Sequence, residues 1–184
     1  LIVNASISDT WILLITQSQQ SGYKRTIRAY SKDGQEVSFR SVSNYYPFAV
    51  YNYPGYNKAS FAVSSLEASG LEANGIFEIL DPAMNQKASI KGENEIFGGC
   101  YPILEERLLI YGEKSLMTID KGYHTIWEKN FEGYSVTAAN VINNKFPVVA
   151  LLNNEEYSRE RRFLTTIQIY NSNGTEKTSF DIDA

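Results

Sequence analysis

The residues best equipped for catalysis are few in this sequence of 184 residues. It contains one histidine, His124, and one cysteine, Cys100. A Ser-His-Asp arrangement would have to use His124, and the Gly-x-Ser-x-Gly pattern of a nucleophile elbow is absent. His124 also lies beside a predicted hairpin turn, where side chains are usually solvated. We therefore expect His124 to be an exposed turn residue and the chain not to be an enzyme.

Metal-binding residues are equally sparse. One histidine and one cysteine cannot form the usual zinc site of His and Cys ligands. Oxygen ligands occur at Asn171 to Gly174 and at Asp181-x-Asp183. A calcium loop, however, needs carboxylates at fixed alternating positions and a distant glutamate, and turn chemistry explains Asn and Gly here. The sequence predicts no metal and no cofactor.

A cluster of aromatic residues between positions 45 and 56 is the most unusual local feature. Exposed tyrosine rings can stack on sugars or anchor a peptide or protein partner. Alternating Tyr and Phe can equally fill the surface of a sheet, and we favour that role because aromatic residues are enriched in strands. A binding role is kept as the alternative. Its candidate residues are Tyr45, Tyr46, Tyr51, Tyr53 and Tyr56.

Composition limits the class of protein. Hydrophobic residues make up 43% and charged residues 21%, which is typical of a globular chain, and 13% aromatic residues favour strands. The net charge of -4 gives no electrostatic reason to bind nucleic acid or an anionic membrane. The longest apolar runs, such as Trp11 to Ile15 and Pro147 to Leu152, are too short to span a bilayer. A single cysteine excludes a disulfide within the chain.

Hairpin-like segments recur along the chain every 39 to 51 residues and begin at Ile27, Phe77, Leu116 and Ile167. About four strands for each such period is typical of β-propeller blades. The strand before each hairpin is a continuous apolar run: WILLI, SFAV, LLIY and PVVALL. Such strands must be covered on both faces, and no helical period supplies that cover. Stacked sheets do, so the sequence predicts an all-β, propeller-like fold of about four blades, with a β-sandwich as the alternative.

One hairpin also resembles a known repeat. LMTIDKGYHTIWEKNF, from Leu116 to Phe131, is similar to the repeat of quinoprotein-type (PQQ-repeat-like) propellers in Ile119-Asp120, Gly122 and Trp127. The other three copies match less well and none ends in Trp. That family includes quinone-dependent dehydrogenases and non-enzymatic scaffolds, such as the lipoprotein that assists outer-membrane protein assembly. No residue here matches the quinone site. WD-type propellers are a second possibility, but their Gly-His and Trp-Asp dipeptides are absent.

The predicted organisation is one domain over residues 1–184. It contains four repeats at about 1–44, 45–92, 93–133 and 134–184. Because the chain begins at Leu1, not Met, we expect a fragment of a longer protein. Four blades would make either a minimal closed propeller or a partial ring, and we favour the partial ring because most closed rings have more blades. If the ring is open, the outer faces of the first and last blades would expose apolar surface.

We expect a non-enzymatic interaction or scaffold module located outside the cytoplasm, as the resemblance implies. Its partner would be another protein or missing blades of the same protein. One alternative is a carbohydrate- or peptide-binding module that uses the region from Tyr45 to Tyr56. Another is part of an enzyme whose catalytic residues lie outside this chain. No nucleic acid is expected as a partner, and no direct membrane insertion.

Overall fold

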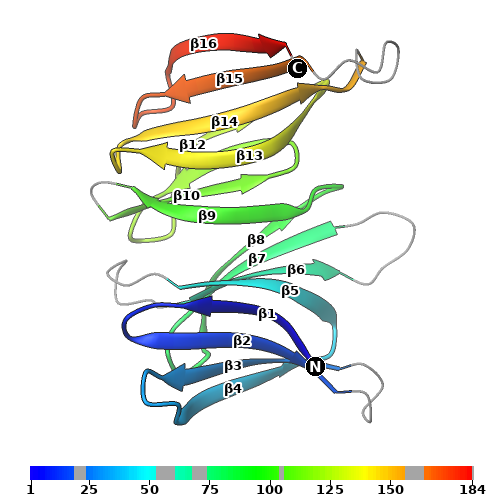
Figure 1. The fold of residues 1–184 in the computed structure, drawn as a ribbon, viewed down its shortest axis with the longest axis vertical. Helices are drawn as coiled ribbons and strands as arrows, with labels where there is room; N and C mark the ends of the chain where they lie inside the picture. The colour runs from blue at the N-terminus through cyan, green and yellow to red at the C-terminus, as the bar shows by residue number, and fades with distance from the viewer. Residues whose placement is uncertain (19–23, 53–60, 68–73, 104–105, 156–163, 184) are drawn as a thin grey trace. The chain divides into compact units, whose positions relative to one another are not determined.

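The computed structural model of this chain is all-β. It describes residues 1–18, 24–52, 61–67, 74–103, 106–155 and 164–183. Sixteen strands form four antiparallel sheets of four strands each, and the strands of every sheet are neighbours in the order of the chain (Figure 1). A propeller blade is a sheet of this kind, so the prediction of a propeller-like chain with about four blades is confirmed.

The four sheets occupy consecutive parts of the sequence. The first consists of β1 (Ile2–Ile7), β2 (Trp11–Gln17), β3 (Arg25–Ser31) and β4 (Glu36–Val42). The second consists of β5 (Tyr45–Asn52), β6 (Phe61–Glu67), β7 (Asn74–Leu80) and β8 (Gln86–Gly92). The third consists of β9 (Phe97–Ile103), β10 (Arg107–Gly112), β11 (Ser115–Ile119) and β12 (Thr125–Asn130). The fourth consists of β13 (Tyr134–Ile142), β14 (Phe146–Asn153), β15 (Leu164–Tyr170) and β16 (Glu176–Asp183).

The chain divides into two compact units, Leu1–Gly99 and Cys100–Ala184. The first unit holds the first two sheets, and the second unit holds the fourth sheet and most of the third. Strand β9 crosses the boundary between them. The expectations of a single domain and of a longer parent protein stay predictions. Across the described part of the chain, no helix has the length and apolar character needed to cross a membrane.

The turn between the third and fourth strands of each sheet has one shared design. A backbone amide donates to the carbonyl oxygen three residues earlier, and the donating residue has a positive φ. Three residues with one in the left-handed region is a common hairpin connection. In the turn of the third sheet, the residue with left-handed backbone is Tyr123, with φ 68°. It is not the neighbouring Gly122, the glycine that resembles the quinoprotein-type repeat. The four donor and acceptor pairs are Gly34 and Ser31, Met84 and Asp81, Tyr123 and Asp120, and Gly174 and Asn171.

Two strand assignments differ from the sequence prediction. Strand β1 was not predicted, because its polar side chains hide the strand pattern. The Asn4 side chain accepts a hydrogen bond from the Val50 amide at 3.1 Å, and the Ser6 hydroxyl accepts one from the Asn52 amide at 3.1 Å. These side chains therefore bond to the backbone of β5. The polar sequence that begins at Ser64 predicts an insert between strands, but residues up to Glu67 continue strand β6.

The first unit has its core between its two sheets. One face of the first sheet packs against the second sheet, where Trp11 meets Phe61 edge to face with ring centroids 5.6 Å apart. Tyr45, at the start of β5, packs at the border of this core. The buried members of the core are Leu13, Ile15, Ile27, Ala29, Val42, Val50, Phe61, Val63, Leu80 and Met84.

The second unit has an equivalent core between the third and fourth sheets. Trp127, the tryptophan of the predicted repeat, packs at the border of this core and stacks on Tyr170 with ring centroids 6.1 Å apart. Its indole N–H donates to the carbonyl oxygen of Ser172 at 3.0 Å. The tryptophan of one sheet is therefore anchored to the hairpin turn of the next. The buried members of the core are Ile103, Leu109, Leu116, Val136, Ala139, Val149, Leu151 and Tyr170.

The four apolar strands that suggested stacked sheets are not covered equally. Residues Phe61 to Ser65 of β6 and Leu108 to Ile110 of β10 are all buried, as expected for strands covered on both faces. In β2 and β14 buried and half-buried residues alternate, so only one face of each strand is fully covered. The prediction of two covered faces therefore holds for the second and third sheets and not for the first and fourth.

Candidate functional site: a polar pocket and two apolar sheet faces

The residues considered for catalysis lie apart from any pocket described below. His124 is in the hairpin turn with its side chain 82% exposed, and its backbone amide donates to the Asp120 carboxylate at 2.9 Å. This is the exposed turn position that we predicted. Cys100 is a buried free thiol, and burial raises its pKa well above the usual value. Among the described residues, no group of three His, Cys, Asp or Glu side chains is placed to hold a metal ion.

The predicted tyrosine cluster does not form one surface. A β-bulge between Pro47 and Ala49 shifts the register of β5 against β6 and reverses the alternation of its side chains. As a result Tyr45 lies on the face that packs against the first sheet, whereas Tyr51 lies on the other face. The Tyr51 hydroxyl donates to the carbonyl oxygen of Gly98 at 2.7 Å, and Tyr46 is 49% exposed. Tyr53 and Tyr56 lie outside the described residues. A ligand site on these tyrosines stays a prediction.

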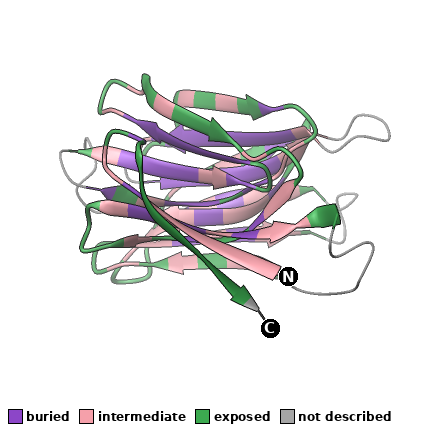
Figure 2. Cartoon of the chain, turned by 90° about the horizontal axis from the view of Figure 1, so that it is seen from above, coloured by how far each residue is buried: buried purple, intermediate pink, exposed green. Residues whose placement is uncertain are grey.

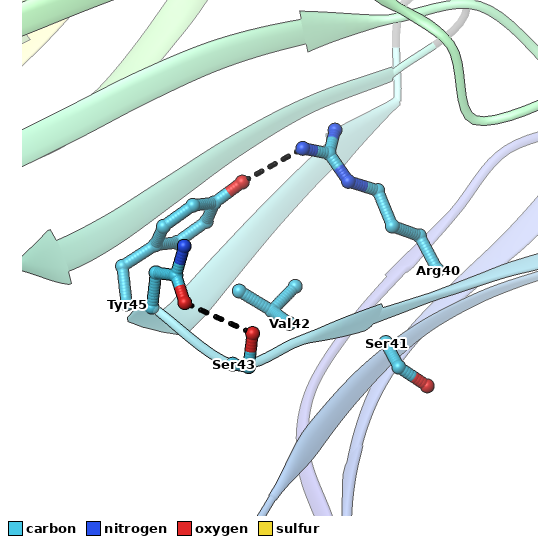
Figure 3. Close-up of a pocket in the computed structure, with 6 residues that line it drawn as sticks. Arg40, Ser41, Val42, Ser43 and Tyr45 are labelled. Atoms are coloured by element: carbon cyan, nitrogen blue, oxygen red, sulfur yellow. Dashed lines mark hydrogen bonds between the residues drawn. The ribbon is translucent and has the colours of Figure 1, made fainter.

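Tyr45 belongs instead to a polar network between the two sheets of the first unit. Its hydroxyl donates to the Glu78 carboxylate at 2.5 Å. The Arg40 guanidinium donates to the same carboxylate at 3.1 Å and to the Tyr45 hydroxyl oxygen at 2.9 Å, the second of which Figure 3 shows. Burial, together with the hydrogen bond to Glu78, raises the pKa of Tyr45 far above its usual value. Tyr45 therefore stays a protonated hydrogen-bond donor at every physiological pH.

A pocket of about 320 Å³ opens beside this network. Its charged groups already have partners, since Arg40 pairs with Glu78 and the Lys91 ammonium lies 3.7 Å from the Glu67 carboxylate. An arrangement in which each acid faces a base can hold a small polar molecule. The pocket is lined by Arg40, Asn44, Tyr45, Glu67, Ile76, Glu78, Gln86, Ser89 and Lys91.

Sequence reasoning missed Glu78 as a candidate site residue. Its side chain is only 2% exposed, although glutamate is rarely buried unless it is paired. The available signal was its place inside the strand GIFEIL, where a carboxylate interrupts an apolar run. A charge in that position needs a partner from another strand, and Arg40 of β4 supplies it.

An apolar surface covers one side of the fourth sheet, and we call it the fourth-sheet face. It lies opposite the side that packs on the third sheet. Phe180 is 50% exposed and Ile182 is 45% exposed, and Figure 2 shows the C-terminal strand β16 largely in the colour of exposed residues. The register joins its members across three strands, for example Ala150 to Ile167 and Ile167 to Phe180. The face consists of Val148, Ala150, Leu152, Ile167, Ile169, Phe180 and Ile182.

The equivalent positions of the first sheet are buried. Ile27 and Ile167 each lie four residues before the first residue of the shared turn, so they are equivalent. Ile27 pairs with Ile15, and both are 0% exposed beneath the second sheet. Ile167 is only half-buried. The fourth sheet therefore has the residues of a sheet-to-sheet contact at positions where no described part of this chain buries them fully.

The first sheet has an exposed apolar surface on its other side, which we call the first-sheet face. Phe39 is 59% exposed there, and the Arg28 guanidinium lies 5.7 Å from the centre of its ring. Both this face and the fourth-sheet face agree with the prediction that the first and last blades expose apolar surface. The first-sheet face consists of Ile7, Ile12, Leu14, Arg28, Tyr30 and Phe39.

Comparison with known proteins gives structural matches only. No protein-family model and no curated protein sequence matches the chain. The crystal structure of a protein of unknown function from Bacteroides caccae matches over 97% of this chain and 60% of that protein, with 9% identity and a TM-score of 0.56. A eukaryotic initiation factor matches over 97% and 54%, with 13% identity and a TM-score of 0.47. The Pan2 WD40 domain of Neurospora crassa matches over 97% and 65%, with 8% identity and a TM-score of 0.45.

The match to the Bacteroides caccae protein shows a shared fold and nothing further, because the identity is 9%. The chain spans 60% of the length of that protein.

Proposed function

We propose that this chain is a non-enzymatic interaction module that binds another protein through the fourth-sheet face. One observation carries the proposal. Positions that are 0% exposed in the contact between the first and second sheets, Ile15 and Ile27, have their equivalents Ala150 and Ile167 at an exposed apolar face. Large apolar faces are seldom left in water, and they commonly mark protein-binding surfaces.

The character of the face favours a protein partner over a small ligand. It is one side of a sheet, and its apolar members are aliphatic except for Phe180, with Thr165 and Thr178 on the same side. Small-molecule sites are usually concave and contain a few polar groups that fix the ligand. Sheets that pack face to face instead interdigitate aliphatic and aromatic side chains, as both cores of this chain do. The fitting partner is therefore another sheet with an apolar face.

The non-enzymatic part of the proposal is supported by the polar network. Glu78, the buried acid, has its carboxylate engaged by Arg40 and Tyr45. Such pairing satisfies the charge of an acid that is buried between two sheets. A measured turnover that is abolished by Glu78→Gln would overturn this part. An exported location belongs to the same proposal, and it is supported only by the resemblance of Leu116 to Phe131 to quinoprotein-type repeats.

Photo-crosslinking tests the proposal directly. A photo-reactive phenylalanine analogue is placed at position 180 of the fourth-sheet face, and at position 173 in the exposed turn of the same hairpin as the control. After irradiation in a lysate of the source cells, we expect discrete protein adducts from position 180 that position 173 does not give. Equal patterns from both positions, or no adduct from position 180, would overturn the proposed binding surface. The mass of each adduct also tells whether the partner is this same chain.

A further inference from the structure

The two exposed faces of this chain are complementary in a way that the internal contacts define. In the first unit, the face of the first sheet that carries Leu13 and Ile27 packs against the face of the second sheet that carries Phe61 and Val63. In the second unit, the third sheet packs in the same sense against the face of the fourth sheet that carries Val149 and Leu151. In each of these two contacts, we call the surface of the earlier sheet its trailing face and the surface of the later sheet its leading face.

The exposed surfaces are one of each kind. The fourth-sheet face is a trailing face, because Ile167 is equivalent to Ile27. The first-sheet face is a leading face, because its pair of Leu14 and Arg28 occupies equivalent positions to pairs in the two internal leading faces. These pairs are Val63 and Glu78 in the second sheet and Val149 and Gln168 in the fourth. The chain therefore presents, on one molecule, both halves of the contact that it already makes twice internally.

We propose that copies of this chain associate head to tail, with the fourth-sheet face of one copy packed on the first-sheet face of the next. This inference rests on the proposed function and names a second copy as the partner. The contact repeats the existing order of faces, so it needs no new kind of surface. Like the internal contact between the first two sheets, it joins an aliphatic face to one that carries aromatic and charged side chains.

The first-sheet face suits this contact in its detail. The Arg28 guanidinium pairs with the Glu36 carboxylate at 2.5 Å, so the charge that would enter the contact already has a partner. The same guanidinium lies over the ring of Phe39. Stacked in this way, the arginine covers apolar surface with its side chain and leaves no unpaired charge beneath a second sheet.

Light scattering after size exclusion tests the inference on the purified chain. We expect a mass that rises with concentration from 20.8 kDa to at least twice that value. Phe180→Lys on the fourth-sheet face and Phe39→Glu on the first-sheet face should each give a monomer, because each places a charge in the contact. Both residues are at least half exposed, so both variants should keep the wild-type circular dichroism. Ser179→Lys, at an exposed neighbour on the opposite side of β16, is the matched control and should associate like the wild type.

Mixing the two monomeric variants gives the decisive result. Phe39→Glu keeps an intact fourth-sheet face, and Phe180→Lys keeps an intact first-sheet face. An equimolar mixture should therefore form a one-to-one dimer and nothing larger. A wild-type chain that stays at 20.8 kDa, or one whose association survives Phe39→Glu, would overturn the inference. If in that case position 180 still crosslinks to a different protein, the proposed function stands and only the identity of the partner is wrong.

Discussion

The network of Arg40, Tyr45 and Glu78 allows a sharp test of what holds the first two sheets together. Replacing Arg40 by Met leaves the Glu78 carboxylate, which is 2% exposed, with the Tyr45 hydroxyl as its one remaining donor in this network. Breaking a buried ion pair by removing one partner costs about 3–5 kcal/mol, and the retained hydrogen bond places this case near the lower value. We therefore expect Arg40→Met to lower the free energy of unfolding of the first unit by about 3 kcal/mol.

The reverse replacement should cost less, because the two partners are not equally buried. In Glu78→Leu the stranded group is a guanidinium that is 27% exposed and can bind water. We expect a loss of about 1–2 kcal/mol, the cost of a polar group left partly unsatisfied. The double variant Arg40→Met with Glu78→Leu strands no charge and should lie within about 1 kcal/mol of the wild type. The two single losses are then non-additive by about 3–5 kcal/mol.

Urea unfolding measures these values in the first unit by itself. The chain has two tryptophans, Trp11 in the first unit and Trp127 in the second, so in a Trp127→Phe background the fluorescence reports only on Trp11. The pair of Lys91 and Glu67 is the control, since its side chains are 69% and 35% exposed and should couple by less than about 1 kcal/mol. Additive effects of Arg40→Met and Glu78→Leu would refute the reasoning.

Two further predictions concern hairpin turns. Gly34 and Gly174 have φ of 80° and 81°, but a β-carbon at Gly34 would meet nothing within 4 Å, whereas one at Gly174 would lie 2.7 Å from the Trp127 ring. We therefore expect Gly34→Ala to lower the free energy of unfolding by about 1–2 kcal/mol, the cost of the left-handed backbone alone. Gly174→Ala should cost clearly more, and thermal unfolding measures both losses. Equal losses would show that Trp127 does not pack on this turn. Burial raises the pKa of Asp81, but the hydrogen bond to Lys87 and those within the turn outweigh it and lower the pKa to about 2. The carboxylate therefore stabilises the fold above its ordinary pKa of 3.8, and that stability is lost as the pH falls toward 2, so acid titrations should show a weaker dependence for Asp81→Asn than for the wild type.

The sheet architecture could be predicted because its signals are local. A hairpin turn and the apolar run before it are both short, and they recur at intervals that only a repeat explains. Strand β1 escaped prediction because its stabilising contacts are distant in sequence. Asn4 and Ser6 bond to the backbone of β5 some 46 residues away, and nothing near them marks a strand.

The candidate site was less accessible to sequence reasoning. Tyr45 and Tyr51 are an even number of residues apart, so a regular strand would place both on one face of the sheet. The bulge after Pro47 instead places them on opposite faces. A bulge inserts a single residue and changes no residue type, so the sequence gives little warning of it. Exposed apolar surface on the first and last sheets of the sequence could be predicted, because an apolar strand there lacks the cover of one neighbouring sheet. Which residues form them follows only from the register.

The central claim is that the fourth-sheet face binds the first-sheet face of a second copy of this chain. It is tested most directly by the methyl signals of isoleucine side chains, recorded by nuclear magnetic resonance over a range of protein concentrations. We predict that the signals of Ile167, Ile169 and Ile182 shift or broaden as concentration rises, while those of Ile110 and Ile119, which are 0% exposed in the third sheet, stay unchanged. Signals of the face that do not respond to concentration, or that change together with the buried pair, would contradict the account.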